Sequence, residues 1–167
     1  MRTQEVLALP KGIKESEIYK YLPYDEEIEL GGYVYRRKIY YSKGDDHSFW
    51  SLPEPEKEKE LIFHTHSVHL LPIPSFLDIA KILVAQSRQS ILITEKTAII
   101  LDVPKNEFIK ILVKVPGVDN NYMREAIQNY IYARTGIRKN LNREYWIDHW
   151  HEILEKDLGF KVKIHPR

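Results

Sequence analysis

The chain contains no cysteine, and this absence excludes several kinds of chemistry. A protein without cysteine forms no disulfide, binds no metal through thiolates and has no cysteine nucleophile. The zinc deaminases are excluded for the same reason, because their metal site needs cysteines in a Pro-Cys-x-x-Cys run. Any metal site in this protein must therefore be built from histidine and oxygen ligands.

An excess of charge and a long hydrophobic run are also lacking. Lys and Arg number 25 against 24 acidic residues, whereas nucleic-acid-binding domains more often carry a basic excess or a basic face. No apolar run approaches the ~20 residues that a membrane-spanning helix needs. The first residues, Met-Arg-Thr-Gln-Glu, do not resemble a secretory signal. We therefore expect a cytoplasmic protein with neither a nucleic-acid nor a membrane partner.

Two histidines stand one residue apart, directly after an apolar run. Residues 60–63, Glu-Leu-Ile-Phe, predict a buried strand that leads into His64 and His66. Because side chains alternate along a strand, the two rings would point to the same side. The carboxylate of Asp78 could complete a set of three ligands. Two histidines and a carboxylate, with the fourth position open, are a recurring arrangement for catalytic zinc.

Asp78 also has a purely structural interpretation. The pattern Ser75-x-x-Asp78 before an apolar helical stretch is typical of a capping box, in which each residue's side chain accepts a backbone hydrogen bond from the other. The two interpretations are compatible. A helix that begins after Ser75 places Asp78 in its first turn, and a metal ligand held by its own helix is well oriented.

With one further acidic residue, this pattern resembles the JAMM motif of the JAB/MPN-type metalloproteases. That motif has an upstream glutamate, a His-x-His pair, a short spacer and Ser-x-x-Asp. The matching positions here are Glu29, His64, His66, Ser75 and Asp78. Two features differ from the usual pattern: Ser67 replaces a proline, and the spacer before the serine is one residue longer.

The resemblance implies a zinc-dependent metallopeptidase that hydrolyses peptide or isopeptide bonds. His64, His66 and Asp78 would hold the zinc ion. Glu29 would accept a proton from water and deliver it to the leaving amine, and Ser75 would stabilise the oxyanion. The implied substrates are proteins or peptides, including conjugates of ubiquitin-like modifiers.

Two other function classes stay open at this point. The altered spacer and the missing proline are compatible with a metal-free binding or scaffold module of the same fold. The other class is a different metallohydrolase, or an unrelated α/β protein in which Ser75 and Asp78 would only cap a helix. Zinc content distinguishes the metal-free module from the metallopeptidase. Chelator-sensitive hydrolysis of ubiquitin-like fusions and peptides distinguishes the metallopeptidase from the other class.

For the fold, the sequence predicts an α/β protein with a mixed sheet flanked by helices. The resemblance implies a JAB/MPN-like (cytidine-deaminase-like) domain over residues 1–117, and residues 118–167 would form a helical extension packed on it. We expect strands at 28–35, 38–42, 60–66, 90–94, 98–101 and 160–164, and residues 5–9 form either an edge strand or an arm lying on the core. We expect helices at 14–22, 76–86, 120–135 and 142–158. Residues 105–113 fit the strand and the helix period equally poorly, and we expect a helix there too.

Several residues outside the motif have two interpretations. His69, in the apolar spacer, is either a further polar group at the site or an ordinary surface residue. His149 and His151 would lie about 200° apart on a helix, so they cannot bind one ion together. Trp146 and Trp150 either pack on the core or serve as anchors for association.

Overall fold

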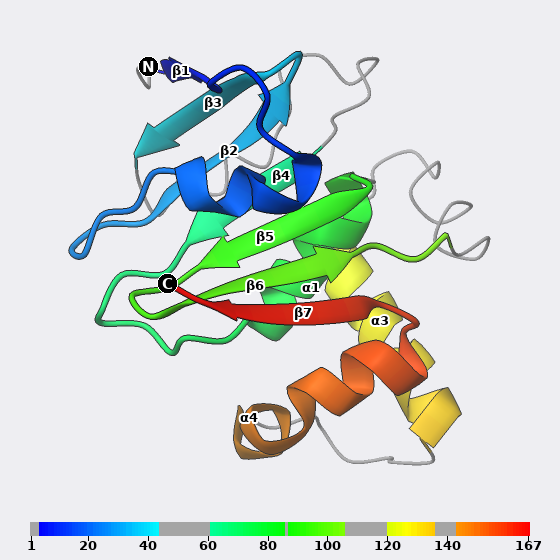
Figure 1. The fold of residues 1–167 in the computed structure, drawn as a ribbon. Coiled ribbons are helices and arrows are strands. Elements are labelled where there is room, and N and C mark those ends of the chain that lie inside the picture. The colour runs from blue at the N-terminus through cyan, green and yellow to red at the C-terminus, as the bar shows by residue number, and fades with distance from the viewer. Residues whose placement is uncertain (1–3, 44–60, 86, 106–119, 136–142) are drawn as a thin grey trace.

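The computed structural model describes residues 4–43, 61–85, 87–105, 120–135 and 143–167 (Figure 1). In this part of the chain a seven-stranded sheet has the order β1-β3-β2-β4-β5-β6-β7. The strands are β1 (Glu5–Ala8), β2 (Leu30–Tyr35), β3 (Lys38–Lys43), β4 (Leu61–Thr65), β5 (Gln89–Ile93), β6 (Thr97–Asp102) and β7 (Lys161–Pro166). The expected α/β class with a mixed sheet is confirmed.

The middle of the sheet contains its single parallel pair. β4 and β5 run parallel, whereas the other neighbouring strands of the sheet are antiparallel. Parallel neighbours need a crossover connection, and helix α1 (Phe76–Ala85) provides it. This connection takes the chain from the carboxyl end of β4 through the spacer to the first turn of α1.

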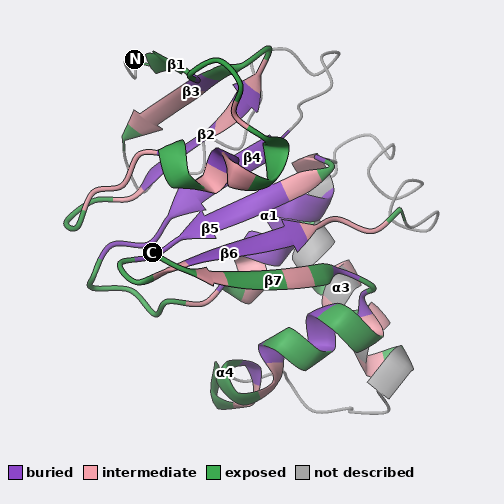
Figure 2. Ribbon diagram, in the orientation of Figure 1, coloured by how far each residue is buried: buried purple, intermediate pink, exposed green. Residues whose placement is uncertain are grey.

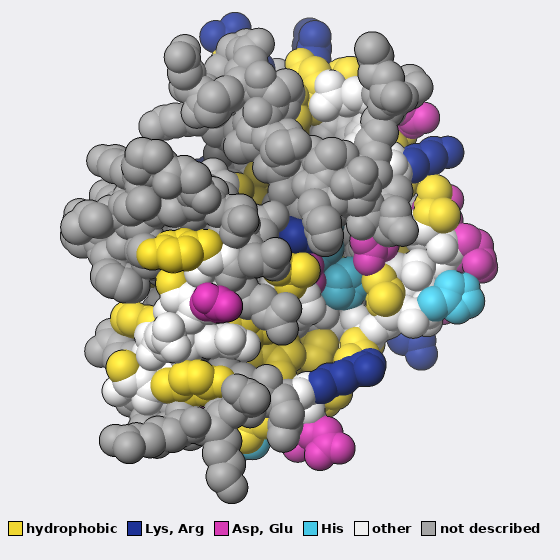
Figure 3. All heavy atoms as spheres, turned by 180° about the vertical axis from the view of Figure 1, so that it is seen from behind, with side chains coloured by type: hydrophobic (Ala, Val, Ile, Leu, Met, Phe, Trp, Pro, Cys, Tyr) yellow, Lys and Arg dark blue, Asp and Glu magenta, His cyan; other side chains and the backbone are white. Residues whose placement is uncertain are grey.

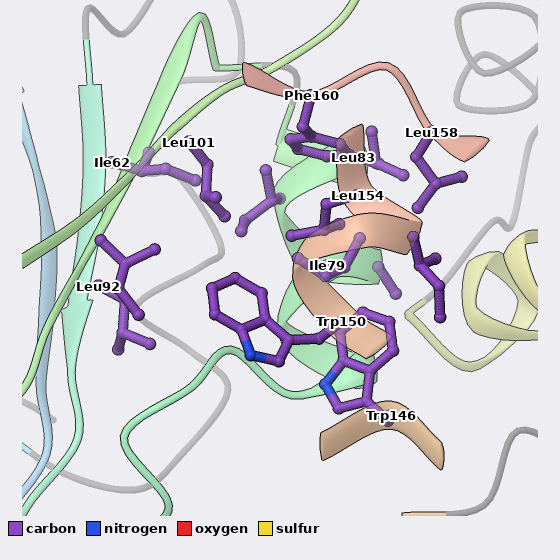
Figure 4. Packing of buried hydrophobic residues seen from close by; sticks show 14 residues of the cluster. Ile62, Ile79, Leu83, Leu92, Leu101, Trp146, Trp150, Leu154, Leu158 and Phe160 are labelled. Atoms are coloured by element: carbon purple, nitrogen blue, oxygen red, sulfur yellow. The ribbon is translucent and has the colours of Figure 1, made fainter. Parts of the chain in front are cut away.

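Each face of the sheet carries its own hydrophobic core. Alternation along β4 sends Leu61 and Phe63 to one face, which the 3-10 helix η1 (Glu15–Tyr21) covers with Ile18. Ile62 points to the other face, where α1 packs (Figures 1 and 4). The central strands are buried and the edge strands β1 and β7 are largely exposed (Figure 2). β1 is thus an edge strand, which is the first of the two alternatives for residues 5–9.

The C-terminal segment belongs to the same sheet and the same core. Helix α3 (Asn120–Thr135) contacts α1, and α4 (Arg143–Glu152) continues into a π-helical turn, η3 (Ile153–Asp157). Trp146 and Trp150 are buried beside Ile79 and Leu83 of α1, so both indoles pack on the core (Figure 4). β7 then pairs with β6.

Two predictions fall on residues that the structure does not describe. The helix expected at 105–113 lies almost entirely within the undescribed residues 106–119, and so does the expected boundary between residues 117 and 118. Both stay predictions. Across the described residues, no helix is long and apolar enough to cross a membrane.

Candidate metal centre

The two histidines of the His-x-His pair lie at the carboxyl end of β4, on the face that α1 covers. His66 follows the last strand residue, and its backbone N–H donates to the carbonyl of Ile93 at 2.9 Å, which extends the β4–β5 pairing. Both side chains are buried, and their ring centroids are 5.0 Å apart. The pair therefore points to one side, as side-chain alternation predicted.

Asp78 acts in the capping box and also faces the imidazoles. The Ser75 backbone N–H donates to Asp78 Oδ2 at 2.8 Å, and the Asp78 N–H donates to Ser75 Oγ at 3.0 Å. Asp78 Oδ2 also lies 3.2 Å from His64 Nε2 and 3.3 Å from His66 Nε2. The capping interactions thus hold the carboxylate in contact with both rings.

These distances fit a tetrahedral metal ion. Two ligand atoms that each lie about 2.0–2.1 Å from a tetrahedral zinc ion are about 3.3 Å apart. The ligand atoms of His64, His66 and Asp78 all lie within 4.8 Å of one another. Among the described residues, these three form the single group of histidine and acidic side chains that could hold a metal ion.

The hydrogen bond at the far nitrogen of His66 fixes how this ring faces the carboxylate. Its Nδ1 lies 2.7 Å from the carbonyl oxygen of Leu71, which can only accept, so Nδ1 carries the proton. In a neutral ring, Nε2 then presents a lone pair toward Asp78 Oδ2. Two acceptors at 3.3 Å need a proton or a cation between them. A backbone carbonyl that orients a histidine in this way is typical of metal ligands.

The protonation of the site follows from the same contacts. Burial alone would lower the pKa of His66. Its pKa is nevertheless raised above the usual value, because Asp78 accepts a hydrogen bond and carries a negative charge, the Leu71 carbonyl accepts another hydrogen bond, and Glu29 adds negative charge. Burial alone would raise the pKa of Asp78, but the charge of His64 and hydrogen bonds from both imidazoles hold it well below its usual range. Asp78 is therefore a carboxylate at neutral pH and is ready to bind a cation.

Glu29 reaches the site from the segment that leads into the neighbouring strand, β2. In the antiparallel β2–β4 ladder, Gly31 pairs with His64, and the Leu30 N–H donates to Thr65 Oγ1 at 2.8 Å. Continued by two residues, this register sets Glu29 opposite His66. Glu29 is half-buried and lines one cavity together with His66 and Asp78. The sequence had suggested that Glu29 lies inside a strand beginning at Ile28. In the structure β2 begins at Leu30, so Glu29 stands just before the strand.

The cavity has a volume of about 440 Å³. The apolar spacer forms one wall through Leu70, Leu71 and Ile73, as expected, and Ser75 lies at its border. Seen from behind, this side of the molecule brings histidine, acidic and hydrophobic side chains together (Figure 3). An acidic group, a polar hydroxyl and an apolar wall therefore line the cavity together with two of the three possible ligands, His66 and Asp78.

Three other histidines among the described residues lie outside the site. His69 is exposed and its Nε2 lies 3.1 Å from Glu27 Oε2, so it is a surface residue and the idea of a further polar group at the site was wrong. His149 Nδ1 contacts the carbonyl of Tyr145, whereas His151 pairs with Glu155. These separate partners agree with the prediction that His149 and His151 do not share an ion.

Sequence reasoning missed the contribution of α4 to the cavity. Arg143, Trp146 and Ile147 line it, and the Trp146 Nε1–H donates to the Pro74 carbonyl at 2.7 Å. The amphipathic pattern indicated that the tryptophans face an apolar surface. Nothing in it indicated that this surface lies next to the spacer and Ser75.

Comparisons of the chain with protein-family models, curated proteins and solved structures found no significant match.

Proposed function

We propose that the protein is a zinc-dependent metallopeptidase of the JAB/MPN type that hydrolyses peptide or isopeptide bonds. The observation that carries this proposal is the position of Asp78 Oδ2, 3.2 and 3.3 Å from the Nε2 atoms of His64 and His66. Two imidazoles and one carboxylate suit zinc and leave a fourth position for water or substrate. The open cavity beside them leaves room for an amide substrate.

The chemistry that a bound zinc ion supplies is Lewis acidity, which polarises a carbonyl and lowers the pKa of water to about 7. Glu29 is the one acidic side chain besides Asp78 among the described residues that line the cavity. In our proposal its carboxylate accepts the proton of the attacking water and delivers it to the leaving nitrogen. General acid–base help of this kind typically contributes about 10²- to 10⁴-fold.

Ser75 has a second role in the proposal. Its Oγ accepts the Asp78 N–H, which leaves its own O–H proton available for another acceptor. That proton would be donated to the oxyanion that develops on the scissile carbonyl. The same residue thus orients one metal ligand and stabilises charge in the transition state.

The experiment compares two glutamates that stand two residues apart. Glu29→Gln should keep the metal content of the wild type and lose turnover by about 10²- to 10⁴-fold. Glu27→Gln is the matched control, because Glu27 is exposed and pairs with His69 outside the cavity. The substrates are a panel of peptides and isopeptide-linked fusions of ubiquitin-like proteins, each with and without a chelator.

The proposal requires chelator-sensitive cleavage that depends on Glu29. It is overturned if the zinc-loaded protein cleaves no member of the panel, or if Glu29→Gln cleaves as fast as Glu27→Gln. A protein that binds zinc without any hydrolysis would instead be a binding module.

A further inference from the structure

Apolar side chains of the spacer, α1 and α4 line part of the cavity beside the metal centre, and this part is called the apolar compartment. Leu71, Ile73, Phe76, Trp146 and Ile147 line this part. Two of these side chains are incompletely covered: Leu71 is 40% and Ile147 38% exposed. Apolar surface gathered in a concave site next to reactive groups is typical of a ligand-binding pocket.

One cation faces this apolar compartment. Arg143, the first residue of α4, is the single Lys or Arg among the described residues that line the cavity. Within the part of the chain that the structure describes, Arg143 makes no ion pair. A guanidinium presents a planar fork of N–H donors that matches a carboxylate in two parallel hydrogen bonds.

We infer that this compartment binds a leaving group that ends in a free carboxylate, an inference that rests on the proposed hydrolase function. The leaving group is one apolar amino acid or a dipeptide, joined through its amino group to the acyl part of the substrate. Its side chain lies against Trp146 and Ile147, and its α-carboxylate pairs with Arg143. The reaction is therefore the removal of one or two residues from a carboxyl terminus.

A chemical constraint places the leaving group and not the acyl group beside Arg143. A carboxylate terminus can lie only on the amine side of the scissile bond in a linear chain. The volume of about 440 Å³ suits a small ligand and not a folded partner.

The bond changes balance with water alone. The amide C–N bond breaks, the hydroxyl of water joins the carbonyl carbon, and a proton joins the nitrogen. The products are an acyl part that ends in a new carboxylate and a free apolar amino acid or dipeptide. Two sources share this chemistry: a small N-acyl amino acid, and the carboxyl terminus of a longer polypeptide.

The first experiment compares acetyl-Gly-Gly-Leu that has a free carboxylate with its C-terminal amide. The wild type should prefer the free acid, and Arg143→Met should lower kcat/KM for it by about 10- to 100-fold, as expected for a charged hydrogen bond. Arg143→Met should leave the amide unaffected, and Arg143→Lys should restore part of the loss. Arg88→Met is the matched control, because Arg88 is an exposed arginine that pairs with Glu15.

The second experiment measures binding without catalysis. Calorimetry on the chelator-treated protein should detect binding of the dipeptide Leu-Phe, which Arg143→Met weakens and Arg88→Met does not. Cleavage assays with three substrates separate the two sources of the leaving group. Acetyl-leucine represents a small N-acyl amino acid, whereas acetyl-Gly-Gly-Leu and a ubiquitin-like protein extended by Leu-Phe represent the carboxyl terminus of a longer polypeptide.

Equal cleavage of the acid and the amide, or an unchanged acid preference in Arg143→Met, overturns the inference even if hydrolysis itself is intact. Binding of Leu-Phe that depends on Arg143, in a protein that hydrolyses nothing, supports the carboxylate site and contradicts the hydrolase. The two proposals therefore fail in distinguishable ways.

Discussion

Gly31 lies directly opposite His64 in the antiparallel ladder of β2 and β4. Opposite residues in such a ladder point to the same face of the sheet, and glycine places no side chain beside the imidazole. The same register brings Glu29 toward His66. One pairing between strands therefore assembles the acidic group and the two histidines on the face where α1 supplies Asp78.

The contact between His66 and Asp78 predicts how the stability of the metal-free protein depends on pH. The pKa of His66 is raised in the folded state, so its stabilisation is fully present below about pH 6.5 and is lost as the pH rises through the folded-state pKa. The pKa of Asp78 is lowered, so its stabilisation is lost only in acid, as the pH falls through its low folded-state pKa. Urea unfolding of the chelated protein should therefore show falling stability from pH 6 to 9.

Two comparisons check this prediction. His66→Gln in the chelated protein should remove most of the decline, because the imidazole whose pKa Asp78 raises is then absent. Stabilisation by added zinc should rise with pH over the same range, because the metal needs a neutral imidazole. If the stability of the chelated wild type changed with pH in the same way as that of His66→Gln, the result would contradict the proposed contact.

Ser75→Ala should lower both stability and metal affinity. The variant loses the Oγ acceptor of the Asp78 N–H, and loss of such a cap costs about 1 kcal/mol. Asp78 would then be held less firmly toward the imidazoles. Ser75→Thr keeps a hydroxyl at the cap and is the control. Urea unfolding and zinc competition measure the two effects, and equal zinc affinity in both variants would argue against an orienting role for the cap.

Trp146→Phe should weaken the link between α4 and the spacer. The variant leaves the buried Pro74 carbonyl without its indole donor, which costs about 1–3 kcal/mol. Trp150→Phe is the matched control, since Trp150 is buried in the same core and has no bond to Pro74. Only Trp146→Phe should also reduce turnover, because Pro74 precedes Ser75. Equal effects of the two variants on stability and turnover would show that packing alone matters.

Local patterns in the sequence predicted the parts of the site that depend on neighbouring residues. The alternation of β4 set the two imidazoles on one side, and the Ser75–Asp78 spacing predicted the capping box that holds the carboxylate. The order of strands and helices also followed from periodicity. Each of these features needs only a few consecutive residues.

The rest depends on contacts between distant segments. The position of Glu29 follows from the register of β2 against β4, and Trp146 meets Pro74 across 72 residues. No local pattern encodes either contact. β2 also begins later than predicted, because Asp25 Oδ1 accepts the N–H groups of Glu27 and Ile28 in a turn before the strand.

The central claim is that His64, His66 and Asp78 hold one metal ion, and elemental analysis of the purified protein tests it most directly. We predict close to one zinc per chain in the wild type, and loss of the metal in His64→Ala and Asp78→Ala. Glu27→Gln should keep it. A wild type that neither contains nor takes up zinc, or an Asp78→Ala variant that retains full stoichiometry while folded, would contradict the account.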